Sequence, residues 1–318
     1  MARVTIIGTG FVGTAIGLAL KERKADLEIV GHDRDFSRAG EARKLGAVDR
    51  AEWNLPSALE GAGMVVVTTP LGVMEKLFSQ MAEFLEPGCI VTDTASLKGL
   101  PLTWASAALS GRAQFVGGHP IVDSHDPFAK PAASLFRNRA YCVVAAPDTS
   151  TEAVDQVVRF IQLLGADPLF IEADEHDSHL ALFGNLPTIV ANSLMHLATA
   201  NPSWRDGRRL AGTAFGGLTA PTLVDPAEQR AQLTANRDAL IRWIAALQAD
   251  LEEMKQQLQM DPDELLELLK VAHQSRGAWH PEASWVPEDL PDQPALRSRE
   301  QISSWFLGGL GGRRKSKP

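Results

Sequence analysis

The chain has 318 residues, of which 45% are hydrophobic, so it is long enough to form two domains with buried cores. Its 31 basic and 39 acidic residues give a net charge of −8, which argues against a general nucleic-acid binder. No apolar run reaches the roughly 20 residues that cross a bilayer, and the N-terminus lacks a signal-peptide pattern. Cys89 and Cys142 lie in apolar runs without metal-ligand spacing, which is typical of core residues in a reducing compartment. We therefore expect a cytoplasmic protein without a membrane span.

The N-terminal segment has the pattern of a dinucleotide-binding turn. An apolar run at residues 4–7 is followed by Gly8-Thr9-Gly10-Phe11-Val12-Gly13 and then by a helix-compatible run. The first glycine allows a sharp turn, the second lets the backbone approach a pyrophosphate, and the third lets helix and strand pack closely. The phosphates then lie at the helix N-terminus, where free N–H groups and the helix dipole favour anions. The predicted cofactor-binding residues here are Gly8, Gly10, Phe11, Val12 and Gly13.

A second strand-like run, at residues 27–32, ends at Asp33, which lies 20 residues after Gly13 (33 − 13). An acidic side chain at this spacing accepts hydrogen bonds from the adenosine ribose hydroxyls, which favours NAD. The neighbouring Arg34 keeps NADP as an alternative, because a guanidinium there is able to meet a 2′-phosphate. We predict that Asp33 and Arg34 contact the cofactor; the simpler alternative for Asp33 is a turn residue at a strand end.

Strand-like and helix-like segments alternate through the first half of the chain. Strands are predicted at 63–70, 89–93, 115–118 (ending at His119-Pro120), 141–146 and 169–171, and helices at 73–85 and 154–164, with a short helix within 47–62. This alternation predicts right-handed crossovers and an α/β fold with a doubly wound, mostly parallel sheet of the Rossmann type. The carboxyl ends of such strands line the ligand crevice. We therefore expect Thr69, Pro70, Ser96 and His119 near the nicotinamide, the first two as cofactor contacts.

From residue 174 onward the pattern is helical, with helices predicted at 175–200, 205–214, 227–260 and 262–273. In the longest of these, apolar residues recur at steps of four and three and form one stripe: Leu240, Ile244, Leu247, Leu251, Met254 and Leu258. The stripe fits either an intramolecular core or a dimer interface. We predict domains at 1–173 and 174–279, and an irregular or disordered tail at 280–318, where prolines precede a basic end.

His119 is the strongest candidate for a catalytic residue. It follows two glycines at a predicted strand end, and its near-neutral pKa suits the proton transfer that accompanies hydride removal from an alcohol. Ser96, at the neighbouring strand end, is placed to hydrogen-bond the same hydroxyl or to orient the imidazole. The alternative for His119 is a structural histidine in a turn.

His176, Asp177 and His179 form a polar cluster at the start of the second domain. Residues 176 and 179 are one helical turn apart, which permits a shared metal ion. An exposed or inter-domain polar helix end is the preferred interpretation, so no metal is predicted. His125 and Asp126 are expected to border the substrate pocket.

These residues together resemble the prephenate and arogenate dehydrogenases, which form tyrosine. The resemblance covers about residues 3–275 and rests on the glycine fingerprint, Thr92-Asp93-x-x-Ser96-x-Lys98, Gly117-Gly118-His119-Pro120, Leu135-Phe136, Tyr141, Glu175-His176-Asp177, Asn185-Leu186-Pro187, Asp225-Pro226 and Asn236-Arg237. It implies a homodimer that pairs through the helical second domain. It also implies NAD(P)-dependent oxidative decarboxylation, with His119 as the acid/base at the substrate hydroxyl and Ser96 as its partner.

The second half departs from the family pattern where substrate should bind. A Ser-His-Leu-Pro-His type motif is usual, but Asn185 and Thr188 replace its histidines; we predict that they line the substrate site. The family arginine that pairs with a substrate carboxylate is replaced by Ala220, a loss that typically costs about 1.5–3 kcal/mol of binding. Three accounts fit: another arginine (Arg205, Arg208 or Arg209) substitutes, a related dehydrogenase or reductase acts on a different small acid, or the protein is a non-catalytic NAD-binding homologue.

Overall fold

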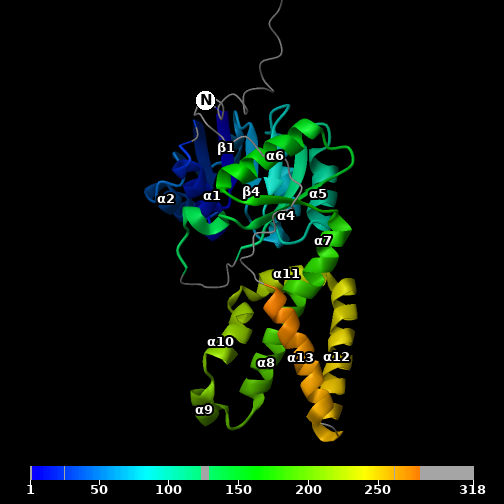
Figure 1. Ribbon diagram of the computed structural model, residues 1–318. Helices are drawn as coiled ribbons and strands as arrows, with labels where there is room; N and C mark the ends of the chain where they lie inside the picture. Colours follow the sequence, from blue (N-terminus) through cyan, green and yellow to red (C-terminus); the bar gives the residue numbers. More distant parts are fainter. Residues whose placement is uncertain (1, 25, 123–128, 261, 280–318) are drawn as a thin grey trace, which may run out of the picture. The chain divides into compact units, whose positions relative to one another are not determined.

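The computed structural model describes residues 2–24, 26–122, 129–260 and 262–279. These residues form two compact units, one ending at Asp177 and the other beginning at Ser178 (Figure 1). The predicted pocket residues His125 and Asp126 and the predicted tail at 280–318 lie outside the described residues.

An eight-stranded sheet forms the centre of the first unit, with the strand order β3-β2-β1-β4-β5-β6-β7-β8. Every neighbouring pair is parallel except β6 and β7. The strands are β1 (Ala2–Ile7), β2 (Leu27–His32), β3 (Arg50–Glu52), β4 (Met64–Val67), β5 (Ile90–Asp93), β6 (Gln114–Pro120), β7 (Ala140–Ala145) and β8 (Asp167–Phe170). The residues of β4 and β5 are all buried, as expected where helices cover both faces of a sheet. The predicted Rossmann-type sheet is confirmed.

The helices of this unit connect the strands. They are α1 (Phe11–Glu22), α2 (Phe36–Lys44), α3 (Leu55–Leu59), α4 (Leu71–Met81), α5 (Gly99–Leu109), α6 (Thr151–Leu164) and α7 (Ala173–Leu180), which extends past the division between the units. Local sequence explains where helices begin and end. For example, the Ser150 hydroxyl accepts the N–H of Ala153 at the start of α6, and Gly165 ends that helix in the left-handed conformation.

The topology places a ligand crevice between β1 and β4. These strands are neighbours, but β1 leads to β2 and β3 whereas β4 leads to β5 and β6, in the opposite direction along the sheet. Because crossovers between parallel strands are right-handed, α1 and α2 cover one face, and α4 and α5 cover the other. Ligands of such sheets bind beyond the carboxyl ends of the strands at this point of reversal.

The sequence patterns missed some boundaries in this unit. The strand predicted from Phe115 begins one residue earlier, at Gln114, and ends at His119-Pro120 as predicted, where it pairs with β7. The helix predicted at 73–85 begins earlier, at Leu71, and ends at Met81. The edge strand β3 was not predicted, because its three residues lack an apolar run.

The second unit is helical, as predicted. It contains α8 (Leu186–Ala200), α9 (Trp204–Gly207), α10 (Thr213–Thr219), α11 (Pro226–Ala235), α12 (Arg237–Met260) and α13 (Pro262–Ala278). The prediction of one helix at 227–260 is wrong. The helix breaks at Asn236, where the backbone leaves helical geometry (φ −109°, ψ 21°) and the side-chain amide donates to Oδ1 of Asn185 at 3.0 Å.

Candidate active site

The loop after β1 has the geometry that a pyrophosphate-binding turn requires. Gly8 has a φ of +98°, in the left-handed region that side chains disfavour. A Cβ atom on Gly13 would lie 2.0 Å from the carbonyl oxygen of Gly8, so only glycine lets α1 pack this closely on the loop. A Cβ atom on Gly10, by contrast, would meet nothing within 4 Å, which leaves open space beside the loop. This geometry fits the three roles expected of the fingerprint glycines.

Beside this loop lie the other residues predicted to hold the dinucleotide. Phe11 and Val12 form the first turn of α1, whose N–H groups have no partner within the helix and suit a phosphate. Asp33 follows β2, and its Oδ2 accepts the N–H of Thr9 at 2.8 Å, so the carboxylate lies against the glycine loop. Arg34 is exposed. The residues present fit a dinucleotide whose ribose approaches Asp33.

Thr69 and Pro70 lie across the crevice, after β4. The preceding residue, Thr68, donates its hydroxyl to the carbonyl oxygen of Gly8 and so joins the loops that follow β4 and β1. The Thr69 hydroxyl is buried and has no hydrogen-bond partner among the described residues. Pro70 occupies the position before α4. Both remain predicted cofactor contacts.

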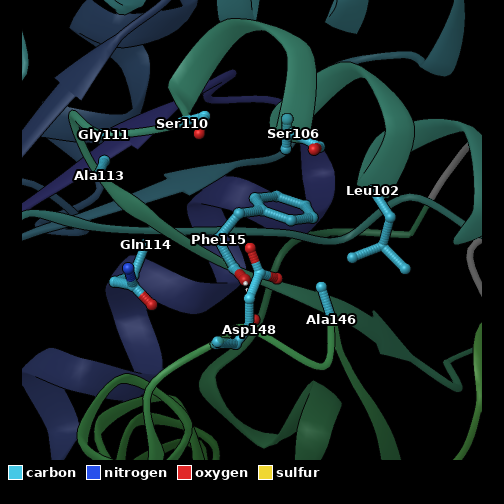
Figure 2. A pocket seen from close by; sticks show the side chains of 11 residues that line it. Leu102, Ser106, Ser110, Gly111, Ala113, Gln114, Phe115, Ala146 and Asp148 are labelled. Carbon is cyan, nitrogen blue, oxygen red and sulfur yellow. Dashed lines mark hydrogen bonds between the residues drawn. The ribbon is translucent and has the colours of Figure 1, made fainter.

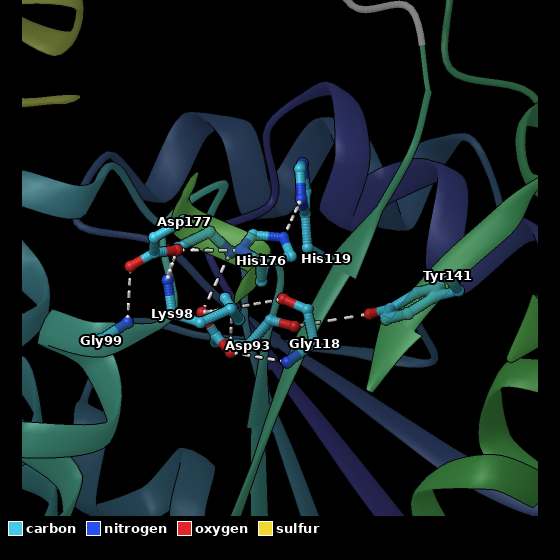
Figure 3. A network of polar contacts seen from close by, with 9 residues as sticks. Asp93, Lys98, Gly99, Gly118, His119, Tyr141, His176 and Asp177 are labelled. Carbon is cyan, nitrogen blue, oxygen red and sulfur yellow. Dashed lines mark hydrogen bonds and ion pairs between the residues drawn. The ribbon is translucent and has the colours of Figure 1, made fainter. Parts of the chain in front are cut away.

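His119 lies near the end of β6, where it pairs with Cys142 of the antiparallel strand β7. Its side chain is half-buried, and its Nδ1 is 3.0 Å from Nε2 of His176, the buried histidine of α7. The Nδ1 of His176 is in turn 2.8 Å from Oδ1 of Asp177. Figure 3 shows the two imidazoles pointing toward each other, with Asp177 beyond His176. His176 lies near the start of α7 but is buried against His119, so an exposed helix end, one of the two forms of the preferred interpretation, is wrong for this residue.

Asp177 also binds the N-terminus of α5. Its Oδ1 accepts the N–H of Lys98 at 2.8 Å, and its Oδ2 accepts the N–H of Gly99 at 2.9 Å. These two amide donors hold the carboxylate at the N-terminus of α5. The line His119–His176–Asp177 thus ends at a fixed negative charge.

A buried ion pair lies beneath this line of residues. The Lys98 Nζ donates to Oδ1 and Oδ2 of Asp93 at 2.8 and 2.7 Å and to the carbonyl oxygen of Gly118 at 2.5 Å, with both charged side chains fully buried. Asp93 also accepts the N–H of Gly118 at 2.9 Å and that of Ala95 at 3.0 Å. Burial raises the pKa of Asp93 and lowers that of Lys98, and each partner's charge opposes the shift of the other. The pair fixes the end of β5 against β6, next to His119.

Ser96 lies in the loop between β5 and α5, within the segment that this ion pair holds. Its Oγ is buried and has no hydrogen-bond partner among the described residues, His119 included. A buried hydroxyl without a partner is costly, so a bound molecule that supplies one is favoured here. The placement fits the predicted role toward a substrate hydroxyl.

The environment of His119 favours its neutral form. Burial holds the pKa of His119 well below its usual value of 6.5, and the positive charge of Lys98 acts in the same direction. A neutral imidazole is able to accept a proton at neutral pH.

The ligand atoms of His119, Cys142 and His176 lie within 4.8 Å of one another, which raises the question of a metal ion. Hydrogen bonding explains the cluster better. The facing nitrogens of the histidines already share a hydrogen bond, and burial raises the pKa of the Cys142 thiol to about 11, although Lys98 opposes this shift. The nearby Lys98 ammonium also disfavours a second cation. His179, the other ligand considered from the sequence, is exposed.

Asn185 and Thr188, predicted to line the substrate site, belong to the helical unit. The Asn185 side chain is buried and accepts from Asn236, and the Thr188 hydroxyl donates to the carbonyl oxygen of Gly184 at 3.0 Å. Both side chains thus make contacts within their own unit, and their role toward substrate stays a prediction.

A pocket of about 110 Å³ lies at the opposite edge of the sheet, where β6 begins and β7 ends (Figure 2). Phe115, Asp148 and Ser110 contribute to its lining, and none of the predicted site residues does. It is separate from the candidate active site.

Two family models match consecutive parts of the chain. The model described as "Prephenate dehydrogenase, nucleotide-binding domain" matches residues 16–169, and "Prephenate dehydrogenase, dimerization domain" matches residues 172–271. The chain belongs to the prephenate dehydrogenase family. This family consists of NAD-dependent oxidoreductases, so the resemblance inferred from the motifs is confirmed.

Relatives in the prephenate dehydrogenase family match most of the chain. The prephenate dehydrogenase of Bacillus subtilis is 27% identical over 309 residues, which cover 93% of this chain and 82% of that protein. The cyclohexadienyl dehydrogenase of Zymomonas mobilis is 24% identical, with 86% of this chain and 94% of that protein covered.

Solved structures of the family share the fold. A prephenate dehydrogenase from A. aeolicus, in complex with hydroxyphenyl propionate and NAD+, has a TM-score of 0.79 at 22% identity, and the match covers 87% of this chain and 98% of that one. A Synechocystis arogenate dehydrogenase has a TM-score of 0.72 at 23% identity, with coverages of 87% and 100%.

Proposed function

We propose that this member of the prephenate dehydrogenase family catalyses the NAD-dependent oxidative decarboxylation of prephenate or arogenate, which gives 4-hydroxyphenylpyruvate or tyrosine. The observation that carries the proposal is the position of His119, half-buried at the carboxyl end of β6 and held by a hydrogen bond from its ring to His176. Curated relatives with these activities support it over a non-catalytic homologue.

The glycine loop, the first turn of α1 and Asp33 are the residues that would hold NAD, which supplies the hydride acceptor. His119 removes the proton of the substrate hydroxyl as hydride leaves the carbon that bears this hydroxyl. The Ser96 hydroxyl, which has no partner among the described residues, offers a hydrogen bond to the same oxygen. Loss of carbon dioxide then makes the ring aromatic. Asp33 favours NAD over NADP, because its charge repels a 2′-phosphate.

Purified protein tested with NAD or NADP and with prephenate or arogenate should form reduced cofactor, followed by its absorbance. His119→Asn should lower the rate by roughly 10²–10⁴-fold, while binding of NAD, followed by thermal shift, stays unchanged. Absence of turnover with both substrates, in protein that binds NAD, would overturn the proposal.

Ala220 stands at the position of the family arginine that pairs with a substrate carboxylate, so a different cation is needed for that role. Arg205, Arg208 and Arg209 are exposed in the helical unit. We propose that one of them substitutes. Its replacement by alanine should raise KM by roughly tenfold or more, as expected from loss of a charge-assisted hydrogen bond, with the other two variants as controls.

A further inference from the structure

No chemical step was assigned above to the buried His176 or to its partner Asp177, yet His176 contacts His119 directly. Nε2 of His176 lies 3.0 Å from Nδ1 of His119, and Nδ1 of His176 lies 2.8 Å from Oδ1 of Asp177. His176 is 4% exposed. Because a buried imidazole needs partners for both nitrogens, these contacts determine where its proton lies.

The direction of the hydrogen bonds follows from the anchored end. The ionised carboxylate of Asp177, which accepts two backbone N–H groups at the start of α5, is only an acceptor. Nδ1 of His176 therefore carries its proton, and Nε2 of the neutral ring is an acceptor. Nδ1 of His119 must then donate, so the unprotonated nitrogen of His119 is Nε2.

We propose that His176 and Asp177 are positioning residues that hold His119 in the tautomer with a free Nε2, the atom that accepts the substrate proton. The inference rests on the proposed function, in which His119 is that acceptor. When the proton moves from the substrate oxygen to Nε2, the O–H bond breaks, an N–H bond forms, and His119 becomes positive. Its Nδ1–H bond to His176, backed by the charge of Asp177, stabilises that imidazolium.

This arrangement also explains why the two residues belong to α7. His119 lies on β6, where it pairs with Cys142 of β7 and follows Gly118, whose carbonyl oxygen accepts from Lys98. The cationic Lys98 disfavours a positive charge on His119. A second histidine with its own carboxylate supplies a compensating negative charge from the other side of the ring.

Kinetics test the positioning role with four variants. Asp177→Asn should lower kcat by roughly 100-fold or more with KM changed little, because an amide permits the opposite tautomer of His176. His176→Leu removes the acceptor for His119 and should do the same. His176→Gln keeps an acceptor at a similar position and should recover at least about tenfold over His176→Leu. Asp174→Asn, an exposed carboxylate on the same helix, is the matched control and should match wild type.

Nuclear magnetic resonance of protein with 15N-labelled histidine gives a readout that does not depend on turnover. In the wild-type protein His119 should show the Nδ1–H tautomer, and His176→Leu should shift it toward Nε2–H while the far-ultraviolet circular dichroism stays unchanged. An Nε2–H tautomer in the wild type, or full kcat in folded Asp177→Asn and His176→Leu, would overturn the inference and leave the proposed function standing. Conversely, the expected tautomer in a protein without turnover would remove the proposed function and leave the hydrogen-bond assignment intact.

Discussion

The absence of a side chain at three positions determines how the loop after β1 packs and what is able to approach it. The three fingerprint glycines occupy different environments, which makes their effects separable. Gly13 is in contact with the backbone of Gly8, whereas Gly10 faces open space. A methyl group added at Gly13 should therefore lower the free energy of unfolding, whereas one added at Gly10 should obstruct an approaching ligand.

Gly13→Ala should destabilise the protein by about 1–3 kcal/mol or more, because its Cβ would overlap the carbonyl oxygen of Gly8 at 2.0 Å. Gly10→Ala should cost less than about 1 kcal/mol of folding free energy. It should nevertheless weaken NAD binding by about tenfold or more, because the new methyl group occupies the space where a pyrophosphate approaches. Urea unfolding and calorimetric titration with NAD measure the two effects. Equal stability losses for both variants would contradict the assignment.

The lowered pKa of His119 predicts how activity depends on pH. The groups around the imidazole are Lys98, His176 and Cys142, and burial lowers its pKa below 6.5. Since the neutral base is the active form, kcat/KM should stay level as pH falls to 6.5 and decline only below it. As pH falls, His119 is protonated at a higher pH in the unfolded chain than in the folded protein. The free energy of unfolding therefore also falls once pH drops below 6.5. A decline of kcat/KM that begins above pH 7 would count against His119 as the base.

Polar contacts, as well as apolar packing, hold neighbouring strands and helices in place near the site. The Asp93–Lys98 pair joins the end of β5 to β6, and Asp177 joins α7 to the start of α5. These contacts bring Ser96, His119 and His176 to the same edge of the sheet. In the helical unit, the Asn185–Asn236 contact has a similar role where α11 gives way to α12.

Lys98→Met should lower the free energy of unfolding by about 3–5 kcal/mol, because it leaves the Asp93 carboxylate buried without its partner. The double variant Asp93→Leu with Lys98→Met should recover part of that loss, since no isolated charge remains. Lys255→Met, which breaks an exposed ion pair with Glu252 on α12, should change stability by less than about 1 kcal/mol. Urea unfolding compares all three, and equal effects at Lys98 and Lys255 would refute this account.

The helical unit exposes apolar side chains that bear on the assembly predicted for this protein. On α12 the predicted stripe is buried only at its start: Leu240 is 4% exposed, whereas Leu251 and Leu258 are 54% and 70% exposed. Helices α7 and α8 are joined by a π-helical segment, Ala181–Asn185, into one run, Ala173–Ala200. By length and composition alone this run is apolar enough for a membrane span, and only 17% of its apolar window is buried. Both surfaces fit burial against a second copy of the chain, in line with a dimerization-domain match at residues 172–271.

We predict a homodimer in solution that forms through the helical unit. Replacement of Leu251 and Leu258 by glutamate should shift the protein to monomers in light scattering after size exclusion, because buried charges oppose association. Leu45→Glu, at an exposed apolar residue of the first unit, is the control and should stay dimeric. A wild-type monomer at micromolar concentration would contradict the prediction.

Local patterns in the sequence predicted a large part of this protein because their physical causes are local. One crossover unit, β1-α1-β2, contains the glycine turn and Asp33, and their spacing within it is readable from the sequence. The position of His119 depends on one strand end, that of β6. Lys98 belongs to the motif Thr92-Asp93-x-x-Ser96-x-Lys98, but the sequence pattern did not predict its buried ion pair with Asp93. An acidic residue at the end of a buried strand with a lysine five residues later was the signal available.

The amino-acid sequence determined the alternation of strands and helices, the glycine loop after β1 and the choice of His119 as the candidate base. Only the tertiary structure decided what surrounds that histidine. His119 and His176 are 57 residues apart, and Lys98 and Asp177 are 79 apart. No spacing rule joins residues at such separations, because the sheet order and the path of α7 bring them together. The partners that orient the predicted base therefore became visible only in the folded chain.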